Sequence, residues 1–117
     1  MSEEISYQIT FLLNKKSRII IGKLGIFEFP AGKYIYTGSA LKNMEKRLER
    51  HLKKNKKLHW HIDYILQTEA CSILNIQKSI IDECMLNQKT PGKIIVPGFG
   101  SSDCRNGCIS HLKFCES

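Results

Sequence analysis

The stretch Gly32-Lys33-Tyr34-Ile35-Tyr36-Thr37-Gly38-Ser39-Ala40 decides how the rest of the 117-residue chain is arranged. Its first half alternates two tyrosines with a β-branched isoleucine, which is typical of a strand. Its second half holds small residues, which allow the backbone to turn tightly. A basic segment, residues 42–57, follows almost at once. The stretch therefore predicts a strand, a turn and a basic helix that form a corner facing phosphate.

The composition predicts one basic domain that binds a polyanion. A chain of this length can bury one core but not two, so residues 1–117 are expected to form a single domain, in which residues 98–117 carry Cys and His. The 18 Lys and Arg exceed the 11 Asp and Glu, for a net charge of +7. Clustered cations favour nucleic acid over a solvated helix face or an anionic membrane surface. The cluster comprises Lys42, Lys46, Arg47, Arg50, Lys53, Lys54, Lys56 and Lys57.

The N-terminal residues and the cysteines bear on the compartment. Residues 1–4 lack the basic and apolar regions of a secretory signal, and no apolar run approaches the about 20 residues that span a bilayer. We therefore expect a cytoplasmic protein with no membrane segment. In a reducing compartment the five Cys are expected to be buried thiols, metal ligands or reactive groups before they are disulfides.

Strand patterns dominate the first forty residues. Residues 5–13 and 18–21 are rich in β-branched and apolar residues and flank a turn-like segment, which predicts a hairpin. Residues 23–31 contain Gly and Pro and predict a short extended piece followed by a turn. Residues 33–37 then predict a third strand.

A helical pattern begins at Met44, after an Asn suited to cap a helix. Met44, Leu48 and Leu52 recur at i, i+4 and i+8 and are expected to be buried. Arg47 and His51 lie on one flank of this stripe, where they can point along the sheet. The side chains expected to contact nucleic-acid phosphates are Lys46, Arg50, Lys53, Lys54 and Lys57.

Residues 58–66 fit two structures. As a strand, they would place His59, His61 and Asp63 on one face, a set of two imidazoles and a carboxylate that suits a transition metal. We favour a short helix instead, because residues 71–76 offer a better next strand. His59 and His61 are then expected beside the site, through hydrogen bonds or contacts with phosphate, and a purely structural role is the remaining alternative.

The last third of the chain predicts one more helix and one more strand. Residues 79–88 have a helical pattern with Glu83 near the middle, residues 93–96 suggest a short strand, and residues 97–103 form a loop. The helix residues expected to face inward are Ile80, Ile81, Cys84 and Met85.

Cys and His recur at short intervals near the C-terminus. Thiolates and an imidazole can close a tetrahedral zinc site. The alternatives are a reduced cluster that packs this segment against the helix carrying Cys84, and an oxidation-sensitive pair of thiols. The candidate zinc ligands are Cys104, Cys108, His111 and Cys115, with Cys84 as a candidate neighbour.

Several motifs together resemble the GIY-YIG nuclease family. Tyr36-Thr37-Gly38 is followed by Arg47 and His51, as the Tyr-Ile-Gly strand end of that family is followed by an Arg and a His on the next helix. Ile5-Ser6-Tyr7 stands in the place of the Gly-Ile-Tyr half, and Glu83 matches the metal-binding Glu. The chain is similar to the small stand-alone, Uri-type members of this family over residues 32–40, 47–51, 58–64, 83–84, 98–104 and 110–112.

The resemblance implies an α/β (α+β) sandwich, with a small mixed sheet of three or more strands flanked by helices. It implies Mg²⁺ or Mn²⁺ held by Glu83, and DNA, with RNA as an alternative, as the partner. Tyr7 and Tyr36 would lie near the attacking water, and Arg47 on the scissile phosphate. The residues expected in or beside the catalytic site are Tyr7, Tyr34, Tyr36, Ser39, Arg47, His51 and Glu83.

Departures from the signature leave a second hypothesis open. Ile5-Ser6 replaces Gly-Ile, Thr37 is the middle residue of the second triad, and the interval from Tyr36 to Arg47 is about one residue longer than in common members. Displacing a reacting group by about 1 Å can cost about 100-fold in rate. The first hypothesis is a metal-dependent endonuclease, and the second is a nucleic-acid-binding module of the same fold without catalysis. A third is a partner-binding protein with a zinc-holding tail.

Overall fold

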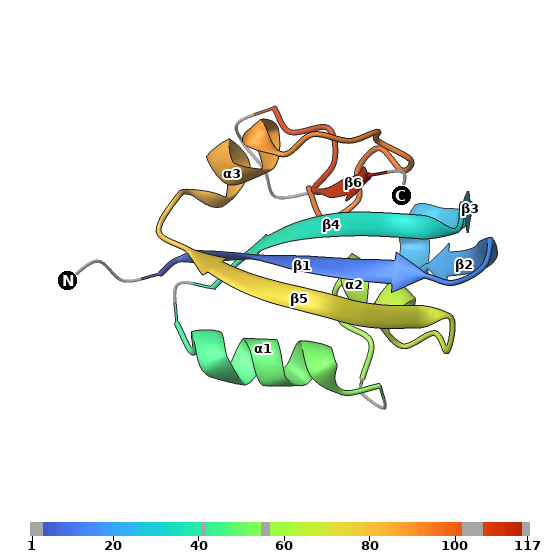
Figure 1. The fold of residues 1–117 in the computed structure, drawn as a ribbon, viewed down its shortest axis with the longest axis horizontal. Helices are drawn as coiled ribbons and strands as arrows, with labels where there is room; N and C mark the ends of the chain where they lie inside the picture. The colour runs from blue at the N-terminus through green and yellow to red at the C-terminus, as the bar shows by residue number, and fades with distance from the viewer. Residues whose placement is uncertain (1–3, 41, 55–56, 102–106, 116–117) are drawn as a thin grey trace.

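The computed structural model describes residues 4–40, 42–54, 57–101 and 107–115. A four-stranded sheet in the order β5-β1-β4-β6 forms its centre (Figure 1), and β2 and β3 form a separate pair. The elements are β1 (Ser6–Leu13), β2 (Ser17–Ile21), a 3₁₀ turn (Gly22–Leu24), β3 (Gly25–Phe29), β4 (Gly32–Ser39), α1 (Met44–Leu52), α2 (His61–Leu66), β5 (Cys71–Ser79), α3 (Glu83–Lys89) and β6 (Leu112–Phe114).

The pairings in the central sheet are antiparallel. β1 lies between β4 and β5, and β6 pairs with the outer edge of β4. The chain leaves β1 through the β2–β3 hairpin and returns along β4, which reverses its direction beside β1. The expected α+β sandwich of three or more strands flanked by helices is confirmed. The prediction of a mixed sheet was wrong, because the described strand pairs of this sheet are all antiparallel.

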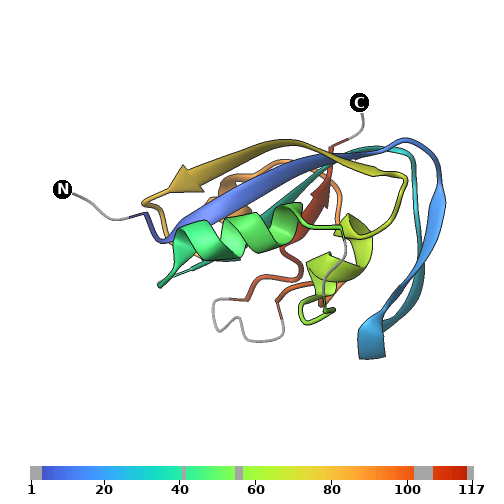
Figure 2. The ribbon, with the colours of Figure 1, turned by 90° about the horizontal axis from the view of Figure 1, so that it is seen from below.

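The helices lie on the two faces of the sheet. α1 and α2 cover one face, and α3 lies on the other side (Figures 1 and 2). On the α1 side, the alternating residues Tyr7, Ile9, Phe11 and Leu13 of β1 are all buried, as the two-residue period of a strand requires. Tyr34 of β4 stacks on Phe11, with ring centroids 5.3 Å apart. Figure 2 shows the β2–β3 hairpin bending down beside α2.

The buried stripe of α1 differs from the predicted one at its C-terminal end. Leu48 is buried and Met44 packs against the core, as expected. Leu52, however, is 58% exposed, and His51 is buried in its place. The stripe therefore runs through positions i, i+4 and i+7, which lie on one face of a 3.6-residue helix as well as i+8 does.

The later elements confirm one choice and correct three. Residues 61–66 form the expected helix. β5 extends to Ser79, so α3 begins only after Asp82, whose side chain caps it; Ile80 and Met85 are consequently exposed, not buried. Lys93 makes a single bridge to Phe114 in place of a strand, and β6 was not predicted. Among the described helices, none has the length and apolar character needed to cross a bilayer.

Candidate active site

The pairing of β1 with β4 brings two of the predicted site tyrosines together. Tyr7 lies opposite Gly38, and Tyr36 is two residues before Gly38 on the same face. Their ring centroids are 6.4 Å apart. A Cβ at position 38 would lie 2.6 Å from the Tyr7 hydroxyl and 3.1 Å from the Tyr36 ring. Glycine is therefore needed here so that both rings can lie over the strand.

His51 of α1 completes a buried pair with Tyr7. The Tyr7 hydroxyl lies 2.7 Å from His51 Nε2, and both side chains are 1% exposed. The His51 ring also lies edge-on to Tyr36, with ring centroids 6.5 Å apart. The predicted set of Tyr7, Tyr36 and His51 therefore meets at one end of the sheet, under α1.

Burial holds both phenols in the protonated form. It raises the pKa of Tyr7 to about 12, although the charge of Arg47 and a hydrogen bond from it oppose that rise. Burial also raises the pKa of Tyr36 well above its usual value, and the charges of Tyr7 and Glu83 add to the effect. Arg47 and Glu83 thus act on both tyrosines, which places the four groups in one electrostatic environment.

Arg47 lies over the indole of Trp60, with its guanidinium 4.5 Å from the ring centroid. The same guanidinium donates through Nη1 to the backbone carbonyl of Ser39. The turn that ends β4 therefore supplies a carbonyl that orients Arg47, and Trp60 supports the planar cation from one side. Ser39, expected as a site neighbour, contributes through its backbone.

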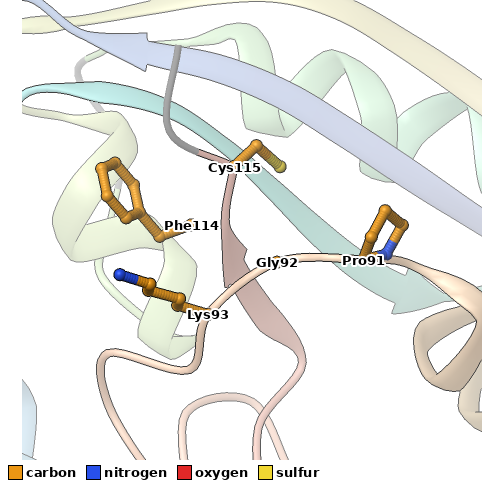
Figure 3. A pocket seen from close by; sticks show the side chains of 5 residues that line it. All are labelled: Pro91, Gly92, Lys93, Phe114 and Cys115. Carbon is orange, nitrogen blue, oxygen red and sulfur yellow. The ribbon is translucent and has the colours of Figure 1, made fainter.

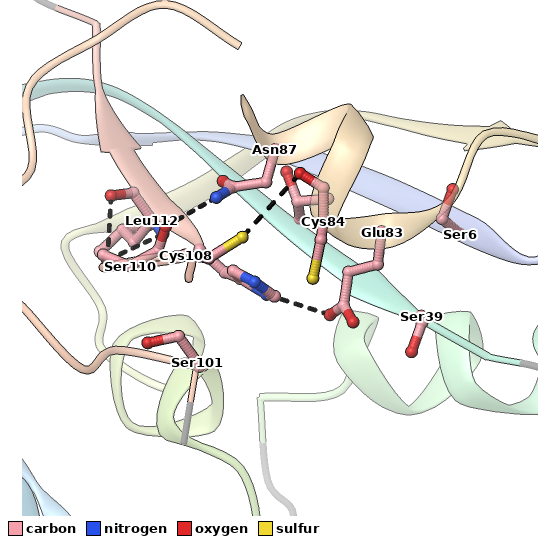
Figure 4. A network of polar contacts seen from close by, with 12 residues as sticks. Ser6, Ser39, Glu83, Cys84, Asn87, Ser101, Cys108, Ser110 and Leu112 are labelled. Atoms are coloured by element: carbon pink, nitrogen blue, oxygen red, sulfur yellow. Dashed lines mark hydrogen bonds and ion pairs between the residues drawn. The ribbon is translucent and has the colours of Figure 1, made fainter. Parts of the chain in front are cut away.

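Glu83 reaches the site from the first turn of α3. Asp82 caps this helix by accepting from the backbone N–H groups of Cys84 and Met85. Glu83 Oε2 lies 3.1 Å from Nδ1 of the buried His111, and Figure 4 shows the carboxylate pointing down from α3, with Ser39 beyond it. We did not foresee His111 as the partner of Glu83. The available signal was the motif Ser110-His111-Leu112, which we interpreted through the family resemblance and, at His111, through zinc, but not as a contact of Glu83.

The predicted neighbours Tyr34, His59 and His61 have structural contacts. Tyr34 donates from its hydroxyl to the Pro30 carbonyl at 2.6 Å and packs in the core, so it is not a second working phenol. His61 Nδ1 accepts from the Gly100 backbone N–H at 2.9 Å, and burial lowers the pKa of this imidazole. His61 therefore holds the loop before residue 101 against α2. The exposed His59 ring lies against Trp60.

Asp63 excludes the alternative metal set of residues 59–63. Its carboxylate accepts two hydrogen bonds from Arg50, both 2.9 Å long. It also accepts from the backbone N–H groups of His59 and Trp60, each at 2.8 Å. These four bonds occupy both carboxylate oxygens and fix the start of α2, so Asp63 has a structural role there.

Two of the predicted phosphate-binding residues use their cationic groups within the protein. Arg50 is taken up by Asp63 and by the ring of Trp60. The Lys54 ammonium donates to the carbonyls of Leu66, Thr68 and Cys71 at 2.7–2.9 Å, where α2 ends. We therefore correct the expectation for these two residues, because their cationic groups stabilise the fold. The predicted residues whose side chains are exposed without these contacts are Lys46, Lys53 and Lys57.

The structure also changes the predicted zinc ligands. Ligand atoms of Cys84, Cys108 and His111 lie within 4.8 Å of one another. Cys115 lies elsewhere: its N–H donates to Lys33 at the start of β4, and it lines a shallow pocket with Pro91, Gly92, Lys93 and Phe114 (Figure 3). Cys104 falls outside the described residues. A possible metal cluster therefore exists, but with Cys84 in it and without Cys115.

Comparisons with known proteins identify the family. No curated protein and no solved structure matches the chain. Residues 6–117 match the family described as "Domain of unknown function DUF123". Because this match covers nearly the whole sequence, the chain belongs to that family.

Proposed function

We propose that this chain is an endonuclease of the GIY-YIG type, which hydrolyses phosphodiester bonds in DNA, with RNA as an alternative substrate. The observation that carries the proposal is the convergence of Tyr7, Tyr36, Arg47, His51 and Glu83 at one end of the sheet. These groups can activate water, hold a phosphate and bind a divalent metal ion. The resemblance to GIY-YIG nucleases predicted the same five residues as the catalytic set.

The buried Tyr7–His51 pair suits proton relay better than direct base catalysis. With a pKa raised to about 12, Tyr7 is not a tyrosinate at neutral pH. Its hydroxyl lies 2.7 Å from His51 Nε2. Tyr7 can therefore take a proton from the attacking water only as it passes its own proton to His51. In this mechanism His51 is the base and Tyr7 carries the proton to it.

Arg47 and Glu83 supply the charges that the reaction needs. The Arg47 guanidinium, held by Trp60 and the Ser39 carbonyl, is positioned to bind the phosphate as negative charge develops. Glu83 fits Mg²⁺ or Mn²⁺, because it presents a partly exposed carboxylate whose contact with His111 uses only Oε2. When bound, such an ion supplies Lewis-acid stabilisation of charge on the phosphate oxygens.

The cleavage test compares the wild type with Arg47→Ala and Glu83→Gln on supercoiled, single-stranded and branched DNA, in Mg²⁺ or Mn²⁺. We expect Arg47→Ala to slow cleavage by about 10²–10³-fold, the usual cost of losing one preorganised donor. Glu83→Gln should remove the dependence on added metal along with most of the activity. Ser39→Ala is the matched control, since it keeps the carbonyl that contacts Arg47. Cleavage that persists undiminished in both variants would end the assignment.

A nucleic-acid-binding module that has lost catalysis is the second candidate. It is favoured by the contacts of Arg47 with the Ser39 carbonyl and of Glu83 with His111, because both groups already have partners within the protein. This alternative predicts binding without turnover on every substrate, and binding that a chelator does not change. The endonuclease predicts turnover that a chelator stops.

Both candidates predict binding that depends on the exposed lysines of α1 and the segment after it. For duplex DNA, log Kobs falls with log[salt] by about 0.9 per phosphate neutralised. Lys53→Ala should therefore reduce the magnitude of this slope by about 1 and weaken binding to unrelated sequences equally. Fluorescence anisotropy at several salt concentrations measures both effects.

The matched control for this measurement is Lys23→Ala, which removes an exposed lysine from the 3₁₀ turn at the β2–β3 hairpin. It should leave the slope unchanged. An equal reduction in both variants would show that binding follows net charge alone. An unchanged slope in Lys53→Ala would remove Lys53 from the interface.

A further inference from the structure

We propose that Cys84, Cys108 and His111 bind one zinc ion, which ties α3 to the C-terminal segment. Their ligand atoms all lie within 4.8 Å of one another. In a tetrahedral site, Zn–S bonds of about 2.3 Å and Zn–N bonds of about 2.0 Å place ligand atoms roughly 3.5–3.8 Å apart. A shift of about 1 Å or less per ligand would thus close the site. Side-chain rotation can supply that shift without moving α3.

The donor atoms select zinc over the metals that bind oxygen. Two thiolates and one imidazole are ligands of intermediate softness, whereas Mg²⁺ and Mn²⁺ prefer carboxylate, carbonyl and water oxygens. The cluster is also shielded from solvent, with Cys84 8% and His111 1% exposed, and Cys108 half-buried. The three ligands leave a fourth tetrahedral position for water or another donor.

Hydrogen bonds already hold the two halves of the cluster against each other (Figure 4). Asn87 of α3 donates to the Ser110 carbonyl at 2.8 Å, in a buried contact. Gln88 donates to Cys108 Sγ at 3.7 Å, and that thiol contacts the Cys84 carbonyl at 3.9 Å. Segment 107–111 is therefore docked on α3 by contacts around the proposed site. Metal binding would need little reorganisation of the backbone.

His111 has the surroundings of a metal ligand. Its Nδ1 lies 3.1 Å from Glu83 Oε2, and we assign Nε2 as the nitrogen that would bind the zinc ion. Imidazoles that bind zinc commonly donate their other N–H to a carboxylate, which fixes the ring and its tautomer. A zinc ion on His111 would in turn hold the Glu83 Oε2 atom that contacts this imidazole. The zinc site itself does not depend on the proposed nuclease activity.

The test uses the full chain, purified under reducing conditions from cells supplied with zinc. Elemental analysis should find about one zinc ion per chain, and replacement by Co²⁺ should give the sulfur-to-cobalt charge-transfer band and strong visible bands of a tetrahedral thiolate site. Cys84→Ser and Cys108→Ser should lose both signals. Cys115→Ser, which removes a thiol of the same segment outside the cluster, should keep both.

A measurement on the wild type guards against variants that fail to fold. Removing the metal with a chelator should lower the melting temperature, and adding back one equivalent of zinc should restore it. Wild-type protein that contains no zinc and takes up none on titration would overturn the proposal. So would equal zinc content in Cys84→Ser and wild type, or a Cys84–Cys108 disulfide in protein kept under reducing conditions. Cleavage activity does not enter these readouts, so the site and the nuclease function can fail separately.

Discussion

A His51→Ala variant is expected to cleave DNA about 10²–10⁴-fold more slowly than the wild type, the usual contribution of a positioned general base. The reason lies in the chemistry of Tyr7. This phenol is buried and its pKa is raised to about 12, so it holds its proton at neutral pH. His51 Nε2, 2.7 Å away, is the acceptor that lets Tyr7 relay a proton from water. Without that acceptor, the relay stops at a phenol that cannot ionise.

The measurement is a set of single-turnover rates for His51→Ala, Tyr7→Phe and the double variant. If the two residues act as one unit, the double variant should be no slower than the slower single variant, because either change already breaks the relay. Leu52→Ala is the matched control on the same helix, since Leu52 is exposed and should tolerate truncation. Losses that multiply in the double variant would mean that Tyr7 and His51 act independently. Unchanged rates in His51→Ala would remove it from the mechanism.

The sequence predicts the local half of this site well. Arg47 and His51 are one helical turn apart, so their common flank follows from the period of α1 alone. The approach of Tyr7 to Tyr36 is different, because it depends on the register that sets Tyr7 opposite Gly38 across a gap of thirty residues. No local pattern specifies that pairing. Only the resemblance to GIY-YIG nucleases pointed to Tyr7.

The cations of α1 and of the segment after it show what a sequence pattern does not predict. Lys53, Lys54 and Arg50 look alike in the sequence, yet the cationic groups of Arg50 and Lys54 donate to groups of the protein, whereas Lys53 is exposed without those contacts. What separates them is tertiary structure: Arg50 meets the buried Asp63, and Lys54 meets the last carbonyls of α2. These partners come from the segment after the helix, whose own fold was ambiguous. A charge cluster therefore predicts the sign of a surface better than it predicts which residues form it.

The metal cluster is a second case in which tertiary structure, and not the local sequence pattern, decides which residues lie together. The intervals between residues 104 and 115 suggested zinc ligands from the tail, with Cys84 only as a neighbour of the site. The structure draws Cys84 into it from α3, 24 residues before Cys108, and leaves out Cys115. β6 is the physical reason, because its three residues pair with β4 and carry Cys115 to the far end of that strand. Such a short strand has too little pattern to be predicted.

An Asp63→Asn variant is expected to lose about 3 kcal/mol of unfolding free energy at pH 7, near the lower end for breaking a buried ion pair. Asp63 is fully buried, whereas the side chain of Arg50 is 26% exposed and can recover some hydration. Asn keeps one oxygen for the backbone N–H groups of His59 and Trp60 but loses the charge that pairs with Arg50. Urea unfolding, followed by circular dichroism, measures the loss.

The dependence on pH separates this charge effect from a simple loss of packing. Burial alone would raise the pKa of Asp63, but hydrogen bonds from Arg50, Trp60 and His59, with the charge of Arg50, lower it below its usual value. A carboxyl whose pKa is lower in the folded state stabilises the protein above its unfolded pKa of about 3.9 and loses that contribution as pH falls through the folded value. The gap between wild type and Asp63→Asn should therefore be full at pH 7 and shrink below about pH 4.

The exposed pair of Lys78 and Glu45 provides the matched control for that gap. Its 2.5 Å contact is shorter than the 2.9 Å contact between Arg50 and Asp63, yet Glu45 is mostly exposed. Glu45→Gln should therefore cost much less than Asp63→Asn, because water screens the pair and solvates either partner alone. If Glu45→Gln and Asp63→Asn cost the same, burial does not govern the Arg50 pair. If the Asp63→Asn gap stays constant from pH 7 to pH 2.5, the loss comes from packing. In either case the charge of Asp63 would not be what anchors α1 to α2 through Arg50. The apolar contacts of α2 alone would then have to hold Trp60 in place beneath Arg47.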